Sequence, residues 1–122
     1  MTLLRLIPIH VHAVLETVLA PIFIVAPFVL GLSPAALVAS VVLGVLLMGT
    51  ALSTGAALSG TDGRGVRVSS HASIDMALAT AAAGCAIGFA LAQEPSAALF
   101  FGTMAILQSV LTTTTRYATL PA

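Results

Sequence analysis

The stretch HAVLETVLAPIFIVAPFVLGL, residues 12–32, decides the fold class of this chain. After Glu16, no charged residue occurs until Asp62. About 20 apolar residues are enough for a helix to cross the hydrocarbon core of a bilayer. An uncharged run of this length therefore predicts a transmembrane helix and not the core helix of a soluble protein.

The composition extends this conclusion to the whole chain. Of the 122 residues, 59% are hydrophobic and 7% are charged, and the mean hydropathy is +1.15. A soluble domain carries about 25% charged residues, so water cannot be the solvent of this surface. We expect an all-α integral membrane protein with four transmembrane helices, forming a single membrane domain over residues 1–122. The single Cys85 allows no internal disulfide bond.

Proline and serine residues mark the expected helix ends. We predict helices over about 9–32, 34–58, 71–93 and 95–117, with a loop at 59–70. Ser33 suits an N-cap and Pro34 the first helical position. Ser70 is a second candidate N-cap, and the pair 94–95, Glu-Pro, is placed like the pair 33–34. Pro21 and Pro27 fall inside the first helix, where a membrane helix tolerates them.

The arginine residues predict the orientation in the membrane. All four fall at the N-terminus, in the 59–70 loop or near the C-terminus, and none falls at the two short turns: Arg5, Arg64, Arg67 and Arg116. Positive residues favour the cytoplasmic side. We therefore expect a multi-pass protein of the cytoplasmic (inner) membrane with both termini in the cytoplasm.

The sequence also predicts an internal repeat. His12 and Glu16 begin one apolar stretch, and His71 and Asp75 begin another, 59 residues later. At the turns the offset between the two repeats becomes 61, because Pro95 corresponds to Pro34. We expect two helical hairpins, about 9–58 and 71–117, that repeat in parallel orientation about an axis along the membrane normal.

The first hairpin resembles a known family. Glu16 is followed by Val-Ala-Pro-Phe-Val-Leu-Gly at 25–31, which is similar to the SPW-repeat membrane proteins. The phrase Ala26-Pro27-Phe28 stands where the family has Ser-Pro-Trp, and residues 85–87, Cys-Ala-Ile, stand there in the second hairpin. The resemblance implies a small bacterial four-helix membrane protein and carries over no catalytic residue.

Ionisable and polar residues are candidates for a functional cluster. A histidine and a carboxylate four residues apart lie on one helix face, and counting 1.5 Å per residue puts Glu16 roughly 24 Å from Leu32, within the cytoplasmic edge of the core. Further polar residues are spaced on one face of the second helix and on one face of the fourth: Thr50, Ser53 and Thr54, then Gln108, Thr112 and Thr115. We expect these faces to converge on the cluster.

Several roles are open for this cluster. His12, Glu16, His71 and Asp75 could pair for structural reasons or bind a divalent metal. They could also form a proton or cation pathway, or the two histidines could bracket a haem. The sequence does not decide which cofactor, if any, is bound.

The leading functional expectation is a non-enzymatic, oligomerising or accessory membrane subunit. No nucleotide-binding, serine-elbow or Cys-x-x-Cys motif is present, and the short loop is too weakly basic for nucleic acid. Gly84 and Gly88 form a GxxxG motif that could pack a helix within the bundle or against another protomer. The expected partners are the lipid bilayer and either a second copy or another membrane protein.

Overall fold

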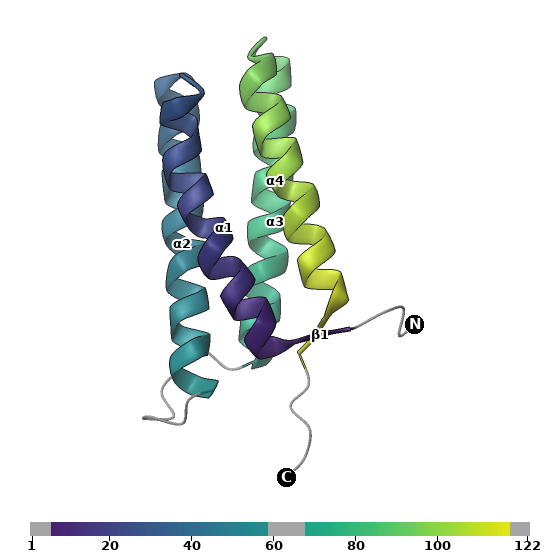
Figure 1. Cartoon of the computed structure of the whole chain (residues 1–122). Helices are drawn as coiled ribbons and strands as arrows, with labels where there is room; N and C mark the ends of the chain where they lie inside the picture. The colour runs from purple at the N-terminus through teal and green to yellow at the C-terminus, as the bar shows by residue number, and fades with distance from the viewer. Residues whose placement is uncertain (1–5, 59–67, 118–122) are drawn as a thin grey trace.

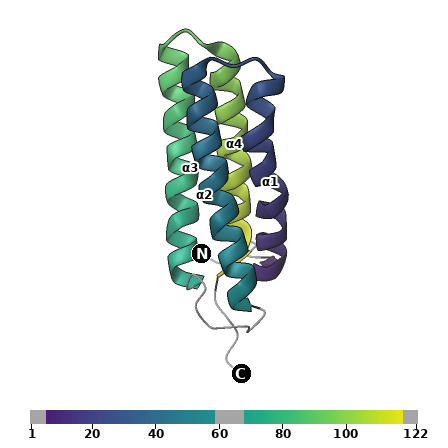
Figure 2. The ribbon, with the colours of Figure 1, turned by 90° about the vertical axis from the view of Figure 1, so that its left-hand side faces the viewer.

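The described residues form a bundle of four helices, which is seen along its length in Figures 1 and 2. The computed structural model describes residues 6–58 and 68–117. The elements are β1 (Ile7–Pro8), α1 (Ile9–Val29), α2 (Pro34–Leu58), α3 (Val68–Leu91), α4 (Pro95–Thr114) and β2 (Thr115–Arg116). The predicted loop at 59–70 and three of the four arginines, Arg5, Arg64 and Arg67, lie largely or wholly outside the described residues.

All four helices are long and apolar enough to cross a membrane, over 9–29, 34–53, 70–91 and 95–114. Their outward faces carry large aliphatic side chains, such as Val18, which is 61% exposed, and Leu99, which is 73% exposed. Exposed aliphatic side chains of this size are costly in water and suited to lipid. The chain is therefore a multi-pass membrane protein, as its composition predicts.

The helices form two hairpins, α1–α2 and α3–α4. Both tight turns lie at one end of the bundle, here called the turn end, at the top of Figure 2. The end of α2 and the start of α3 lie at the opposite end, here called the loop end. At the turn end, the Ser33 hydroxyl donates a hydrogen bond of 2.6 Å to Glu94 Oε2 and so joins the two hairpins.

The turn between α1 and α2 matches the prediction except for the residue at which α1 ends. α1 ends at Val29, three residues before the predicted end, because Gly31 adopts a positive φ of 64° that stops the helix. The Leu32 amide then donates to the Pro27 carbonyl at 3.0 Å. Ser33 is the N-cap of α2 as predicted, since its hydroxyl accepts from the Ala36 amide at 3.3 Å.

The loop end departs further from the predicted boundaries. α3 begins at Val68, so Ser70 lies inside the helix and its predicted capping role is wrong. α4 ends at Thr114, three residues early, because Thr115 is extended, with φ −89° and ψ 139°. The extended residues of β2 pair in parallel with β1, Thr115 opposite Ile7. This pairing carries the chain after α4 across the end of the bundle, next to the start of α1.

The interior toward the turn end is apolar. Phe23 of α1, Leu47 of α2 and Phe101 of α4 are among its fully buried side chains. Gly44 lets α2 approach α1 closely, because a Cβ at this position would lie 2.7 Å from Ile24 Cγ1. Among the described residues, the buried ionisable side chains and most of the buried polar side chains lie toward the loop end.

A candidate metal centre at the loop end

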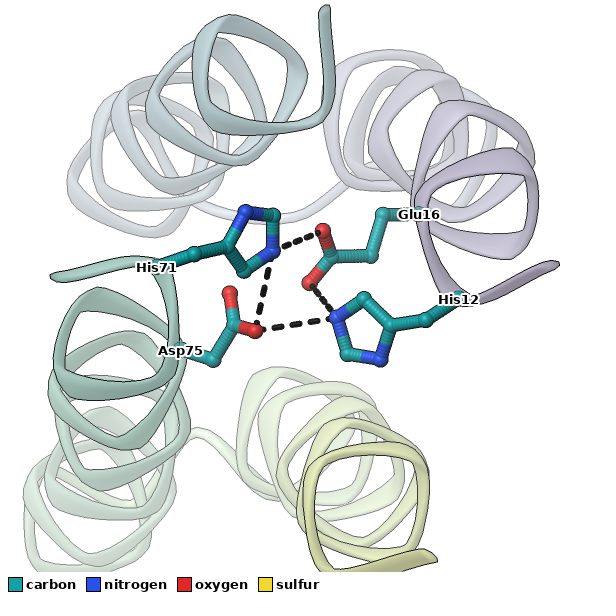
Figure 3. A group of neighbouring side chains, drawn as sticks. All are labelled: His12, Glu16, His71 and Asp75. Atoms are coloured by element: carbon teal, nitrogen blue, oxygen red, sulfur yellow. Dashed lines mark hydrogen bonds and ion pairs between the residues drawn. The ribbon is translucent and has the colours of Figure 1, made fainter. Parts of the chain in front are cut away.

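Four ionisable side chains meet in the interior near the loop end. His12 and Glu16 come from α1, and His71 and Asp75 come from α3, one helical turn apart in each pair. All four are fully buried, and one ligand atom from each lies within 4.8 Å of the others. Figure 3 shows the two imidazoles and the two carboxylates pointing toward one another across the space between the hairpins. The structure thus brings the four candidate ligands of the sequence together.

Each histidine faces both carboxylates. His12 Nε2 lies 3.0 Å from Glu16 Oε1 and 2.9 Å from Asp75 Oδ2. His71 Nε2 lies 3.0 Å from Glu16 Oε2 and 3.0 Å from the same Asp75 Oδ2. The two imidazole rings are 5.2 Å apart between centroids and nearly perpendicular, at 71°. The result is a closed ring of two nitrogen and three oxygen atoms around one point.

A second layer of side chains holds the carboxylates. Gln108 of α4 donates from Nε2 to Glu16 Oε1 at 3.0 Å. Tyr117, which follows β2, donates its phenol hydrogen to Asp75 Oδ2 at 2.7 Å. Helix α4 and the segment after it therefore orient the groups that α1 and α3 supply, which is the usual arrangement around a metal ligand.

Thr115 fixes the proton on His12. The Thr115 hydroxyl donates its single hydrogen to the Leu111 carbonyl at 2.6 Å. His12 Nδ1 lies 2.6 Å from the same hydroxyl oxygen, which can then only accept. His12 must therefore carry a hydrogen on Nδ1. In the neutral imidazole, the lone pair of Nε2 faces the two carboxylates.

Tyr117 covers the cluster at its loop end. Its ring meets that of His12 edge to face at a centroid distance of 5.3 Å, and it lies 6.1 Å from that of His71. Burial, followed by the neighbouring Asp75 carboxylate, raises the pKa of the Tyr117 phenol well above its ordinary value. The phenol therefore stays a hydrogen-bond donor at neutral pH. No sequence pattern pointed to Tyr117, because the predicted α4 ran to this residue and hid the change of direction at Thr115.

The predicted polar face of α4 reaches the cluster, and that of α2 does so only in part. Thr112 is buried like Gln108, although its hydroxyl has no hydrogen-bond partner among the described residues. On α2, Thr50 is buried but donates to the Leu46 carbonyl at 2.8 Å, and Ser53 is half-buried. The side chain of Thr54 lies outside the described part of the chain.

The GxxxG motif of α3 is not used inside the bundle. Gly84 and Gly88 are exposed, and a Cβ at either position would meet no atom within 4 Å. The sequence left packing within the bundle and packing against another protomer open, and the first of these is wrong. Packing against another protomer stays a prediction.

The arrangement at the loop end can hold a cation. Two imidazole nitrogens and up to four carboxylate oxygens are the donors that bind divalent first-row metals in proteins. The second layer of Gln108, Thr115 and Tyr117 restrains three of the four ligands. Comparisons with models of known protein families, with curated proteins and with solved structures found no match, so the geometry of the site carries the functional interpretation.

Proposed function

We propose that this membrane protein binds one divalent transition-metal ion between its two hairpins, with His12, Glu16, His71 and Asp75 as ligands. The observation that carries the proposal is the hydrogen bond from His12 Nδ1 to Thr115. It directs the lone pair of neutral His12 at two carboxylate oxygens, at 2.9 and 3.0 Å. Three electron-rich atoms at these distances need a positive charge among them, which is either a proton on His12 Nε2 or a metal ion. A single divalent ion supplies that charge to both histidines and both carboxylates at once.

Charge balance supports a divalent ion. The two carboxylates are fully buried, and a buried charge without a partner is strongly unfavourable. A divalent cation among two carboxylates and two neutral imidazoles gives a site with no net charge. The donor set has no thiolate, which favours Zn²⁺, Fe²⁺, Co²⁺ or Mn²⁺ over soft monovalent copper.

A proton or cation pathway is less well supported. Between the cluster and the turn end the core consists of side chains such as Phe23, Leu47 and Phe101. The buried Ser40 in this region donates its hydroxyl hydrogen to the Phe23 carbonyl. A conducted ion would need polar groups or water along that route, and a bound metal needs neither.

A haem is less well supported for a geometric reason. Two axial histidines must lie on opposite faces of a porphyrin, which fills the plane between them. Here Glu16 and Asp75 each approach both histidines within 3.0 Å. The carboxylates thus occupy the space that the porphyrin would need.

The site is assigned to the cytoplasmic side of the membrane in this proposal. The arginine distribution supports cytoplasmic termini, and both described chain ends approach the bundle at the loop end. The half-buried Tyr117 then faces the cytoplasm, from which the metal would enter.

The direct test is metal content. Wild-type protein in detergent is stripped with a chelator, dialysed against each divalent metal and analysed by elemental mass spectrometry. We expect about one metal per chain, and loss of binding in the Glu16→Gln/Asp75→Asn double variant. Glu94→Gln is the matched control, because Glu94 bonds Ser33 at the opposite end of the bundle.

Two results would contradict the proposal. The first is wild-type protein that retains no metal, whatever ion is offered. The second is metal that binds equally to the double variant, because the ion would then lie elsewhere. A double variant that unfolds is distinguished by circular dichroism, and the single variant His71→Gln then replaces it.

A further inference from the structure

Thr112 differs from the other threonines of the bundle. Each of the other threonines whose side chain is described donates its hydroxyl to the carbonyl four residues earlier: Thr17, Thr50, Thr80, Thr103 and residues 113–115. This bond satisfies the hydroxyl within its own helix. Thr112 is buried, at 6% exposure, and its hydroxyl makes no such bond. The side chain forgoes the interaction that its neighbours use.

The hydroxyl of Thr112 lies beside the metal ligands. Thr112 lies three residues before Thr115, whose hydroxyl accepts from His12, and its own hydroxyl is buried without a partner among the described residues. One turn earlier on the same face of α4, Gln108 bonds Glu16. Thr112 therefore faces the region between the cluster and its Tyr117 cover.

Gln108 presents a second unused oxygen on this face. Its Nε2 must point at Glu16, because a carboxylate oxygen 3.0 Å away can accept but cannot donate. The orientation of the amide is thereby fixed, and Gln108 Oε1, which is buried, has no partner among the described residues. The third unpartnered buried oxygen in the described chain is Asp75 Oδ1, which belongs to a proposed metal ligand and can bind the ion itself.

We propose that the metal carries one water molecule in addition to its protein ligands, and that Thr112 and Gln108 hold this water. The inference rests on the proposed metal site. Water bound to a divalent ion is a strong hydrogen-bond donor, and Gln108 Oε1 and Thr112 Oγ1 are both able to accept. A small polar donor thus accounts for two buried oxygen atoms that the protein leaves unpaired, each of which is otherwise costly.

The chemical consequence concerns the class of metal site. A structural zinc site has four protein ligands and is closed, whereas a site with a water ligand has an exchangeable position. A small neutral or anionic molecule could replace the water there, between Thr112 and the half-buried Tyr117. The inferred ligand class is therefore a small oxygen donor that coordinates the metal and accepts or donates hydrogen bonds at α4.

The test reads the water directly. Chelator-stripped protein is loaded with Co²⁺ in ¹⁷O-enriched water, and electron–nuclear double resonance detects ¹⁷O bound to the ion. We expect a strong ¹⁷O coupling in wild type and in Thr112→Ser, which keeps the hydroxyl, and a lost or altered coupling in Thr112→Val. Thr114→Val is the control, because Thr114 bonds its own helix at Val110 and is only half-buried.

Thermal unfolding supplies a second readout from the same variants. In metal-free protein, Thr112→Val should unfold at the wild-type temperature or above, because it removes an unpaired hydroxyl. In the metal-loaded protein it should unfold several degrees lower, because the water loses a partner. Co²⁺ bound at one ion per chain without ¹⁷O coupling would overturn the water ligand and leave the metal site standing. Protein that binds no metal would overturn both proposals.

Discussion

Replacing Thr115 with valine tests how the protein positions the proposed metal ligands. Valine keeps the shape of threonine and removes the hydroxyl that accepts from His12 Nδ1 at 2.6 Å. Thr115 and His12 are both fully buried, so water cannot replace the lost partner. The Nδ1 hydrogen of His12 is then left unpaired, or the neutral ring carries its hydrogen on Nε2 instead. A hydrogen on Nε2 would prevent that nitrogen from binding the metal.

Two independent estimates give the magnitude. A buried donor without a partner costs about 1–3 kcal/mol. Loss of the group that orients a metal-ligating histidine typically lowers metal affinity about 10- to 100-fold, which corresponds to about 1.4–2.7 kcal/mol. Because the two ranges overlap, we expect Thr115→Val to weaken metal binding by 10- to 100-fold and to leave the helices intact.

The assay is a competition titration against a chromophoric chelator, with Thr114→Val as the control that leaves His12 untouched. Nitrogen-15 NMR of labelled histidine in the metal-free protein supplies the tautomer. The reasoning would be refuted by a Thr115→Val variant that binds metal as tightly as wild type. It would also be refuted by a neutral wild-type His12 whose hydrogen is on Nε2.

Two further predictions follow from the packing and from Tyr117. Gly44→Ala should lower the free energy of unfolding by about 1–3 kcal/mol, because the new Cβ would lie 2.7 Å from an Ile24 side-chain atom. Gly88→Ala is the control, and it should be neutral or slightly stabilising because its new Cβ meets no atom within 4 Å. Chemical denaturation of both variants measures the difference. Tyr117 is the single tyrosine of the chain, so ultraviolet absorbance follows its ionisation directly. Its raised pKa means that the folded protein holds the phenol proton more tightly than the unfolded chain, whose pKa is about 10. Stability should therefore be complete below about pH 10 and fall as the pH rises above it, a loss that Tyr117→Phe should abolish; a phenol that ionises near pH 10 in folded wild type would contradict this.

The local sequence signals were strongest where one physical effect dominated. The uncharged run after Glu16 predicted a membrane helix because no other solvent tolerates it, and four apolar helices are present. Ser33 predicted the start of α2 because its side chain and Pro34 act within a single turn. The predicted end of α4 failed because a distant partner competed, since Thr115 is extended and pairs with Ile7 of β1. The predicted start of α3 was also wrong, because Ser70 lies inside the helix.

The candidate site likewise has features that local sequence patterns predicted and features that they did not. The spacing of His12 with Glu16 and of His71 with Asp75 put each pair on one helix face, and the repeated spacing suggested that the pairs meet. That they approach within 3.0 Å depends on how the hairpins pack, which no local pattern encodes. The roles of Thr115 and Tyr117 depend on an extended segment that the helical periodicity of α4 concealed.

The sequence by itself determined that the helices lie in a membrane, how many helices there are, and which residues have side chains able to bind a cation. These properties follow from hydropathy, from helix geometry and from side-chain chemistry, which are local. The tertiary structure decided which atoms face one another: the proton on His12, the cover provided by Tyr117 and the unpaired hydroxyl of Thr112. These follow from contacts between residues as far apart as His12 and Thr115, and such contacts form only when both hairpins and the chain after α4 pack together.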